Sequence, residues 1–380
     1  MGASSQGPVK GRLLSAEAGW SRSLEVWVMR GLHVDRDRSA CRSAILRGMT
    51  QARLDIKIRE AVPRLEGVTL ETQLLAFDCP DKRVRLLLKL ENHQVTGSFK
   101  ARGAWNQISL LSAEERERGV IATSSGNHGK ALSWAAQRAG IKATIVMPAD
   151  AYPNKIAACR EHGAEVVLGD TRAEAETICA ERVAAGAVLI HPYDAERTAQ
   201  GAGTVGLEIT QQDPSVEVVI APVGGGGLIT GVSLAVRQEL GSSVPVIGVE
   251  PEGAASMQRG LVAGEPVLLE EITTEVQGLC PLSSGKLNVA TCAETVDSVL
   301  LVTDEQIFAA QAALVLAGEV VEPAGAATTA LVLSGRIPER WLEGRTAADP
   351  LRVVAIVSGG NPDPAQLEAV RLAQGMEKNG

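Results

Sequence analysis

The sequence predicts an α/β protein, because strands and helices alternate along most of the chain. From about residue 84, short apolar or β-branched runs such as 143–148 and 217–223 alternate with longer stretches at helical spacing. Alternation of this kind is typical of parallel βαβ units. The strand runs are apolar almost throughout, so we expect sheets that are covered by helices on both faces. A chain of 380 residues has room for about two or three domains.

Each element is justified by its own pattern. Helix 127–140 has apolar residues at helical spacing and ends at Gly140, and helix 153–163 begins at Pro153, in agreement with the usual stop and start signals. An amphipathic helix is expected over 49–65, with Leu54, Ile58, Ala61, Val62 and Leu65 on one stripe. The remaining expected strands are 85–90, 119–125, 143–148, 165–169, 188–192, 217–223, 245–250, 296–302 and the run 352–361, and the remaining helices are 171–186, 228–241 and 304–318.

The first 48 residues differ in charge from the rest. They carry a net charge of +4, whereas residues 49–380 carry −12. Organelle transit peptides are rich in Arg and Ser but poor in acidic residues, and the four acidic residues in this segment count against one. We therefore interpret 1–48 as an N-terminal extension outside the fold, with Met49 as the start of the folded part.

Composition excludes several classes of protein. The net charge of −8 disfavours a general nucleic-acid or anionic-membrane surface. No apolar run approaches the roughly 18–20 residues that span a bilayer. The six cysteines are scattered without a CxxC pair, and no HExxH motif occurs, so neither a zinc ribbon nor a redox pair is predicted. We expect reduced thiols in a cytoplasmic protein.

Four consecutive glycines, 224–227, lie between an expected buried strand and an expected helix. Ligands of open α/β sheets bind at the carboxyl ends of strands, and the exposed amides of such a loop suit a phosphate group. The alternative is a tight turn without a ligand, but four glycines carry an entropy cost that favours a function. A second glycine motif, GAGTVG at 201–206, lacks the preceding strand that a dinucleotide site requires, and we interpret it as close packing or a loop.

Three further segments carry polar groups at expected strand ends or helix starts. SFKARG (98–103) contains Lys100, and a desolvated lysine loses its proton readily and forms Schiff bases. SSGNHG (124–129) offers donors suited to a carboxylate, and SGGN (358–361) places Ser358 at the end of a strand. Taken singly, each has an ordinary explanation: a solvated lysine, a helix cap and a turn.

Together and in this order, these segments resemble the fold type II pyridoxal-phosphate enzymes, most closely the threonine/serine dehydratase and serine racemase group. The resemblance covers roughly 68–361 and rests on TGSFKARGA (96–104), SSGNHGKAL (124–132), HPYD (191–194), PVGGGGLITG (222–231), VEPEGAAS (249–256), EPAGA (322–326) and SGGN (358–361). It implies a tryptophan synthase β-like fold of two domains, each a mostly parallel sheet flanked by helices. Transferred to this chain, the large domain spans 49–121 and 193–375, and the small domain spans 122–192.

The resemblance also implies the roles of individual residues. Lys100 binds the cofactor covalently, the glycine loop holds its phosphate, Asn127 contacts its 3′ oxygen and Ser358 its ring nitrogen. Serine racemase has an acidic residue at the position of Ser256, so a monovalent cation is expected here rather than a tight divalent site. The implied site comprises Lys100 and Ser125 as catalytic residues; Lys100, Phe99, Asn127, Gly224, Gly225, Gly226, Gly227 and Ser358 as cofactor contacts; Ser124, Ser125, Asn127 and His128 as substrate contacts; and Glu250, Ala254 and Ser256 as cation ligands.

The implied function is a pyridoxal-phosphate dependent lyase of amino acid metabolism, which eliminates the β-hydroxyl group of threonine or serine to give a 2-oxo acid and ammonia. An amino-acid racemase is the first alternative, with Ser125 as the second acid/base. Tyr193 argues against it, because racemases of this group have Asn at that place. Phenylserine or 3-hydroxyaspartate remain alternative substrates, and a non-catalytic phosphate sensor is an alternative of another class. We expect a homodimer that binds a small amino acid and neither nucleic acid nor membrane.

Overall fold

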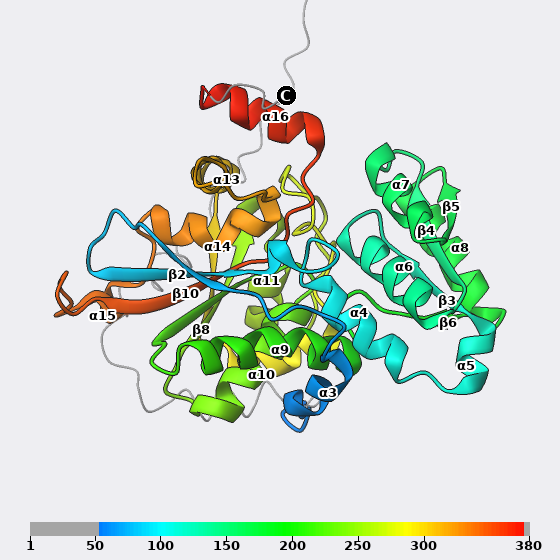
Figure 1. Ribbon diagram of the computed structural model, residues 1–380, viewed down its shortest axis with the longest axis horizontal. Helices are drawn as coiled ribbons and strands as arrows, with labels where there is room; N and C mark the ends of the chain where they lie inside the picture. Colours follow the sequence, from blue (N-terminus) through cyan, green and yellow to red (C-terminus); the bar gives the residue numbers. More distant parts are fainter. Residues whose placement is uncertain (1–52, 376–380) are drawn as a thin grey trace, which may run out of the picture. The chain divides into compact units, whose positions relative to one another are not determined.

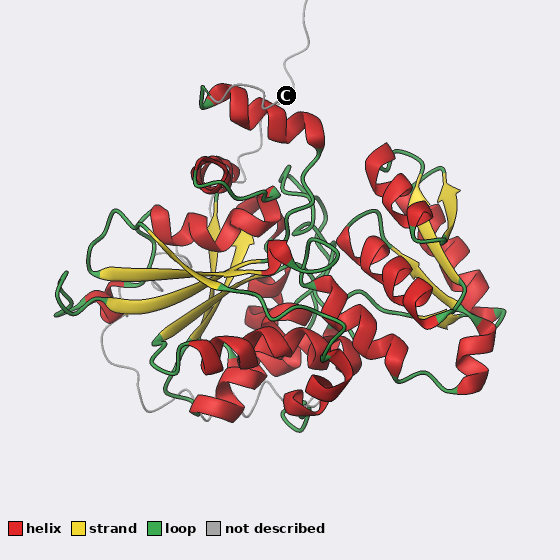
Figure 2. Cartoon of the chain, viewed as in Figure 1, coloured by secondary structure: helices red, strands yellow, loops and turns green. Residues whose placement is uncertain are grey.

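The computed structural model describes residues 53–375, and its strands form two sheets (Figures 1 and 2). The six-stranded sheet has the order β1-β2-β10-β7-β8-β9, and the four-stranded sheet has the order β5-β4-β3-β6. The first contains β1 (Leu74–Phe77), β2 (Val84–Leu90), β7 (Val218–Pro222), β8 (Val246–Pro251), β9 (Ser298–Val302) and β10 (Leu351–Val357). The second contains β3 (Val120–Thr123), β4 (Ala143–Pro148), β5 (Glu165–Gly169) and β6 (Val188–Leu189).

Parallel pairing dominates both sheets, as the sequence predicts. All neighbours in the four-stranded sheet are parallel, and the larger sheet is parallel except where β1 pairs antiparallel with β2. β1 was not expected. Its four residues, LLAF, are apolar but exposed or only partly buried, and this run is shorter than most of the expected strands.

Helices cover both faces of the large sheet (Figure 1). Helices α13 and α14 pack on one face, in a core that includes Leu314 and Leu331, and α9, α10 and α12 pack on the other, with Val205 and Val232 in that core. The helices of the described chain are η2 (Ile58–Ala61), α3 (Val62–Leu65), η3 (Glu91–His93), α4 (Lys100–Ser109), α5 (Ala113–Arg118), α6 (Asn127–Ala139), α7 (Pro153–Glu161), α8 (Arg172–Ala184), α9 (Glu196–Gln212), α10 (Gly227–Leu240), η4 (Glu252–Ala254), α11 (Ser256–Ala263), α12 (Lys286–Thr295), α13 (Asp304–Leu316), α14 (Pro323–Leu333), α15 (Glu339–Leu342) and α16 (Pro364–Ala373).

The four-stranded sheet is covered in the same way. Helix α6 contributes Ala131, Leu132 and Ala135 to a core with α4 and the sheet. On the opposite face, α8 contributes Ala175 and Cys179. The α/β class and the two sheets therefore agree with the prediction.

The amphipathic helix expected over 49–65 is confirmed only for residues 58–65 of its described part. There the chain forms the short 3₁₀ helix η2 followed by the single turn α3. Leu54 and Val62 are exposed, whereas Ile56 and Ile58 are both buried. Ile58, Ala61 and Leu65 of the predicted stripe are buried at helical spacing. Pro63 within α3 removes the N–H that a continuous helix would need at that point. The extension 1–48 lies outside the described residues.

The GAGTVG segment lies inside α9, where it packs against α10. A Cβ on Gly203 would lie 2.7 Å from the carbonyl oxygen of Gly231, and one on Gly206 would lie 2.9 Å from that of Val232. Side chains at these positions would hold the helices apart. The interpretation as close packing is confirmed.

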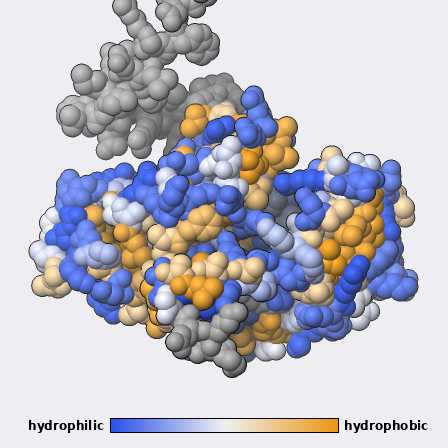
Figure 3. Space-filling model, turned by 90° about the horizontal axis from the view of Figure 1, so that it is seen from above, coloured by the Kyte–Doolittle hydropathy of each residue, from blue (hydrophilic) through white to orange (hydrophobic). Residues whose placement is uncertain are grey.

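No helix within residues 53–375 is long and apolar enough to cross a bilayer. On the face seen in Figure 3, hydrophobic residues form separate patches among hydrophilic ones. Exposed apolar residues such as Leu168, Val262 and Leu372 lie on different elements. Scattered apolar residues of this kind are ordinary for a protein surface.

Candidate active site

Lys100 is the first residue of α4, close to the end of strand β10. The backbone N–H of Phe99 donates to the carbonyl oxygen of Ser358 at 3.1 Å, and Ser98 forms an isolated bridge with Gly359. These contacts join the segment before the lysine to the segment that follows β10. Residues from two distant motifs, SFKARG and SGGN, therefore lie side by side.

Lys100 is partly buried, and its amine has a partner within the protein. Its Nζ donates to the carbonyl oxygen of Pro192 at 2.8 Å and lies 5.0 Å from the centre of the Phe99 ring. Burial lowers the pKa of Lys100 from 10.5 to about 8, because desolvation disfavours the charged form. The amine therefore has a substantial neutral fraction near neutral pH, as a nucleophile or base requires.

The glycine loop opens α10 at the end of β7 and lies against Tyr193. A Cβ on Gly225 would overlap the ring carbons of Tyr193, and one on Gly227 would be 3.0 Å from the Tyr193 backbone. Gly226 has a φ of +96°, which disfavours side chains. The carbonyl oxygen of Gly225 accepts hydrogen bonds from Gly285 N–H at 3.0 Å and Asn288 Nδ2 at 2.8 Å. The loop is thus a cradle at the start of a helix in which Gly225, Gly226 and Gly227 have no room for a side chain, and it suits a phosphate group.

The SSGNHG loop joins β3 to α6. Oγ of Ser124 accepts hydrogen bonds from the N–H groups of Gly126 at 3.3 Å and Gly129 at 3.1 Å, so its own hydrogen is left to donate. Ser125 is exposed. Nε2 of His128 donates to the carbonyl oxygen of Ile190 at 2.8 Å, and burial lowers the pKa of His128 to about 3. The histidine is therefore neutral, and the donors of this loop come from hydroxyl and amide groups.

Asn127 begins α6 and contacts two residues that the sequence analysis left without a role. Its Nδ2 donates to the carboxylate of Glu322, and its Oδ1 accepts from Nδ2 of Asn361 at 2.8 Å. Glu322 is buried, and desolvation raises the pKa of its carboxyl group. Ser358 is also buried, with its Oγ 3.4 Å from the carbonyl oxygen of Ala324. EPAGA and SGGN thus meet the SSGNHG loop at Asn127.

The expected cation ligands lie next to the glycine loop. The carboxylate of Glu250 accepts hydrogen bonds from the N–H groups of Met257 at 2.8 Å and Gln258 at 2.9 Å, at the start of α11. Oγ of Ser256 lies 2.8 Å from Oγ of Ser284, which in turn lies 3.5 Å from the carbonyl oxygen of Gly224. Burial raises the pKa of Glu250 to about 7. Ala254 is buried in the adjoining 3₁₀ helix η4.

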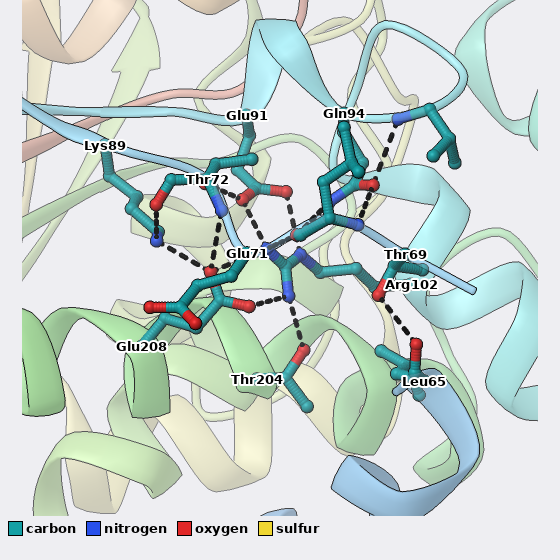
Figure 4. Close-up of polar contacts among 12 residues, drawn as sticks. Leu65, Thr69, Glu71, Thr72, Lys89, Glu91, Gln94, Arg102, Thr204 and Glu208 are labelled. Carbon is teal, nitrogen blue, oxygen red and sulfur yellow. Dashed lines mark hydrogen bonds and ion pairs between the residues drawn. The ribbon is translucent and has the colours of Figure 1, made fainter. Parts of the chain in front are cut away.

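A buried cluster of charged residues anchors the first turn of α4 (Figure 4). Nε and Nη2 of Arg102 donate to the two carboxylate oxygens of Glu91 at 2.8 and 2.7 Å, and Nη2 also donates to Glu208 at 2.9 Å. Nζ of Lys89 donates to the same carboxylate of Glu208 at 2.6 Å. Two cations thus meet two anions, which offsets the cost of burying each charge. Arg102 lies two residues after Lys100, so the cluster fixes the helix that carries the amine.

The structure therefore brings most of the sequence-predicted site residues into one region. Sequence reasoning missed the contacts of Tyr193, Glu322 and Asn361, although the motifs that contain them were noticed. It also missed Asn288, whose Nδ2 links the carbonyl oxygens of Tyr193 and Gly225. Asn288 lies within an ordinary helical stretch, and no local signal distinguishes it. Asp194 was similarly unassigned, and its carboxylate accepts from Lys286 N–H and Leu287 N–H, each at 3.0 Å.

Comparisons with known proteins agree with this site. Residues 66–359 match the family described as pyridoxal-phosphate dependent enzyme. The chain is 40% identical to the L-threonine ammonia-lyase of Thermotoga maritima over 331 residues, which cover 85% of this chain and 79% of that protein. The structure is similar to maize serine racemase, with a TM-score of 0.76 at 32% identity, covering 86% of this chain and 98% of the other. It is also similar to the processed form of threonine deaminase isoform 2 from Solanum lycopersicum, with a TM-score of 0.77 at 33% identity and coverage of 86% and 91%.

The expected family, fold type and cofactor are confirmed by these matches. The site has the two features that pyridoxal phosphate needs. The glycine loop offers exposed amides to the phosphate, and Lys100 offers a partly neutral amine to the aldehyde. This chain belongs to the family of pyridoxal-phosphate dependent enzymes.

Proposed function

We propose that this protein removes the β-hydroxyl group of threonine or serine and releases a 2-oxo acid and ammonia. The observation that carries the proposal is the position of Lys100. Its amine, with a pKa lowered to about 8, lies beside the HPYD segment that covers the glycine loop. Relatives named L-threonine ammonia-lyase and threonine deaminase support the same reaction class.

In this proposal, one set of residues binds the cofactor and Lys100 moves the proton. Glycines 224–227 hold the cofactor phosphate, Ser358 bonds the ring nitrogen, and Phe99 and Asn127 complete the cofactor contacts. Bound pyridoxal phosphate supplies an electron sink for the charge that develops at the substrate Cα. The amine of Lys100 takes the proton from that carbon. Because the pKa of Lys100 is about 8, the amine can accept and return this proton near neutral pH.

The substrate carboxylate binds at the start of α6. The loop offers hydrogen-bond donors: the free hydrogen of Ser124, the exposed hydroxyl of Ser125 and the amides near Asn127 and His128. Donors of this kind favour a ligand that only accepts hydrogen bonds, such as a carboxylate. The positive end of the helix dipole adds to the attraction. His128 remains neutral at physiological pH, so it contributes shape and a hydrogen-bonded ring rather than a charge.

A racemase is the second candidate function, because maize serine racemase is structurally similar. Racemisation needs an acid on the second face of the substrate, and exposed Ser125 is the candidate. Tyr193 favours elimination, because its ring covers Gly225 and its OH donates to the carbonyl oxygen of Ser283 at 3.3 Å. This bulk shapes the pocket beside the cofactor.

A monovalent cation at Glu250, Ala254 and Ser256 is part of the proposal. One carboxylate with carbonyl and hydroxyl oxygens suits a weakly bound hard cation better than tight divalent binding. We expect modest activation by potassium. Strict dependence on magnesium or calcium, abolished by a chelator, would contradict this assignment.

The proposal extends to organisation. We assign 122–192 to a small domain and 49–121 with 193–375 to a large one, which is supported by the division of the strands into two separate sheets. We also propose a homodimer in the cytoplasm that binds no nucleic acid. Sedimentation of the purified protein tests the dimer.

The deciding experiment measures two products in one time course. The purified protein is incubated with L-threonine, L-serine, phenylserine and 3-hydroxyaspartate, and 2-oxo acid release is followed beside chiral chromatography of the remaining amino acid. We expect oxo acid from threonine or serine to exceed the D-isomer by a wide margin. Faster accumulation of the D-isomer would establish the racemase, and a colourless protein without oxo acid release would revive the non-catalytic phosphate sensor. A Lys100→Ala variant is the inactive control.

A further inference from the structure

A chain of side-chain hydrogen bonds leads from Lys130 to Asn127. Nζ of Lys130 donates to Oδ1 of Asn361 at 2.8 Å. Nδ2 of Asn361 donates to Oδ1 of Asn127 at 2.8 Å and to the carbonyl oxygen of Thr96 at 2.9 Å. Nδ2 of Asn127 then donates to Glu322. The chain therefore runs from an ammonium group through two amides to a carboxyl group.

We infer that Lys130 and Asn361 are positioning residues that set the orientation of the Asn127 amide, so that its nitrogen rather than its oxygen faces the cofactor. This inference rests on the proposed contact between Asn127 and the 3′ oxygen of pyridoxal phosphate. It assigns a function to Lys130, and to Asn361 of the SGGN segment, beyond the roles proposed above.

Hydrogen-bond polarity leaves one arrangement. An asparagine amide can be turned by 180° with little change in shape, so its surroundings must decide its direction. The ammonium group of Lys130 can only donate, and the carbonyl oxygen of Thr96 can only accept. Asn361 must therefore present its oxygen to Lys130 and its nitrogen to Thr96 and Asn127. Asn127 must in turn present its oxygen to Asn361.

The far end of the chain requires the same direction. Glu322 offers acceptor oxygens, so Asn127 donates to it from Nδ2. Burial raises the pKa of Glu322, while the charges of Lys155 and Lys130 act to lower it. Even a protonated carboxyl group keeps an accepting oxygen, so the direction of the amide does not depend on that proton.

The arrangement leaves one useful hydrogen. Nδ2 of Asn127 has two hydrogens, of which Glu322 takes one, and Asn127 is only partly buried. The second hydrogen is available to a ligand that accepts, as the 3′ oxygen of the cofactor does. A reversed amide would point its carbonyl oxygen at that oxygen, and two acceptors repel one another.

The positioning residues come from both sheets. Asn127 and Lys130 belong to α6, which packs on the four-stranded sheet, whereas Asn361 follows β10 of the six-stranded sheet. Figure 1 shows α6 beside the strands of the four-stranded sheet and β10 beside β2 of the six-stranded sheet. The same contacts could serve only to hold α6 against the segment after β10. The test must therefore distinguish an effect on the direction of the Asn127 amide from an effect on the stability of the fold.

The test reverses the polarity at Asn361. In Asn361→Asp the carboxylate still accepts from Lys130 but cannot donate to Asn127. The amide of Asn127 then lies between two acceptors, the new carboxylate and Glu322, so its present direction loses one of its two supports. We expect the apoprotein to bind pyridoxal phosphate at least about tenfold more weakly, the effect of losing one hydrogen bond to a charged group. We also expect the visible absorption band of the bound cofactor to weaken in favour of its near-ultraviolet band. Asn127→Ala removes the amide altogether, so it gives the largest loss of cofactor affinity and the largest spectral change that this contact can cause.

Changes at Lys130 and Lys155 complete the series. Lys130→Met removes the donor that orients Asn361 and should shift the spectrum in the same direction by a smaller amount. Lys130→Arg keeps a donor-only group and should retain the wild-type spectrum. Lys155→Met is the matched control, because Lys155 donates to the backbone oxygen of Asn361 at 2.5 Å and touches neither amide. Lys155→Met removes a positive charge close to Asn361 but leaves the donor and acceptor directions of the side-chain hydrogen bonds unchanged.

The outcomes distinguish this inference from the proposed function. Wild-type protein without a borohydride-stable cofactor on Lys100 would overturn the proposed site itself. A labelled wild type, together with an Asn361→Asp variant that has wild-type affinity and spectrum, would overturn the positioning role alone. An unchanged Asn127→Ala would do the same. Thermal unfolding of each apoprotein identifies misfolded variants, and Lys130→Met, at a partly exposed position, keeps the test open if Asn361→Asp does not fold.

Discussion

The ring of Tyr193 lies where a side chain on Gly225 would begin. A Cβ at that glycine would overlap three carbons of the ring, Cγ, Cδ1 and Cδ2. The OH of Tyr193 also donates to Ser283, and its backbone oxygen accepts from Asn288 at 3.1 Å. The ring cannot withdraw without breaking the hydrogen bond of its OH, and the Asn288 bond holds the Tyr193 backbone. The shape of the glycine loop therefore depends on a residue 32 positions earlier in the chain.

The first prediction concerns this contact. Gly225→Ala should weaken the binding of pyridoxal phosphate by tenfold or more, because either the loop or the ring must move and the phosphate amides lose their alignment. Isothermal titration of the apoprotein measures the affinity. The double variant Gly225→Ala/Tyr193→Ala restores the space and should regain part of the affinity. A single variant that binds like the wild type would show that the loop tolerates a side chain.

The second prediction concerns the buried charges of Figure 4. Arg102→Met leaves the buried carboxylate of Glu91 without its cation, and such a loss costs about 3–5 kcal/mol of unfolding free energy. Arg182→Met is the control, since its ion pair with Glu165 is exposed and should contribute no more than about 1 kcal/mol. Urea unfolding of both variants gives the comparison. Equal losses of unfolding free energy in the two variants would mean that the buried ion pairs contribute no more to stability than an exposed one.

The third prediction follows from the lowered pKa of Lys100. Only the neutral amine attacks an aldehyde, so cofactor attachment to the apoprotein should accelerate with pH up to about 8 and then level off. Borohydride fixation after short exposures, followed by peptide mapping to Lys100, measures the rate. Lys100→Ala should show no label at this position. A rate that continues to rise towards pH 10 would indicate an amine with the ordinary pKa.

The fourth prediction uses the raised pKa of Glu250. Burial raises this pKa from 4.5 to about 7, so the folded state holds a proton that the unfolded chain releases. The stabilisation is complete below pH 4.5 and is lost as the pH rises to about 7, by at most about 3 kcal/mol. Glu250→Gln should remove this slope from the unfolding free energy measured in tetramethylammonium buffer. Potassium should flatten the slope in the wild type if the cation binds there, and a variant with the wild-type slope would disprove the assignment.

The fifth prediction separates lyase from racemase. In a lyase, Ser125 only bonds the substrate carboxylate, so Ser125→Ala should raise KM by about 10- to 150-fold, the effect of one hydrogen bond to a charged group. In a racemase the same change would abolish D-isomer formation while elimination continued. Paired assays of oxo acid and D-isomer measure both. Selective loss of the D-isomer would favour the racemase.

The sequence alone determined the fold class and the family, because both depend on local patterns. Apolar runs such as 143–148 and 217–223 mark buried parallel strands whatever they pair with, and the strands β4 and β7 occur there. The glycines 224–227 likewise indicate a cradle at a strand end without reference to their neighbours. Motifs that combine backbone geometry with a reactive group, such as SFKARG, can be recognised before any contact is known.

Only the tertiary structure decided how the site residues meet. Asn127 and Asn361 are 234 positions apart, and Arg102 and Glu208 are 106 apart. Their polar side chains follow no period along the chain, so nothing local indicates which partner each will find. The segment 53–65 shows the same limit, since its apolar spacing suits one continuous helix, while the chain is helical only from Ile58 onward and Val62 of the predicted apolar stripe is exposed. Burial and hydrogen-bond pairing are properties of the folded neighbourhood, and the packing of the two sheets creates that neighbourhood.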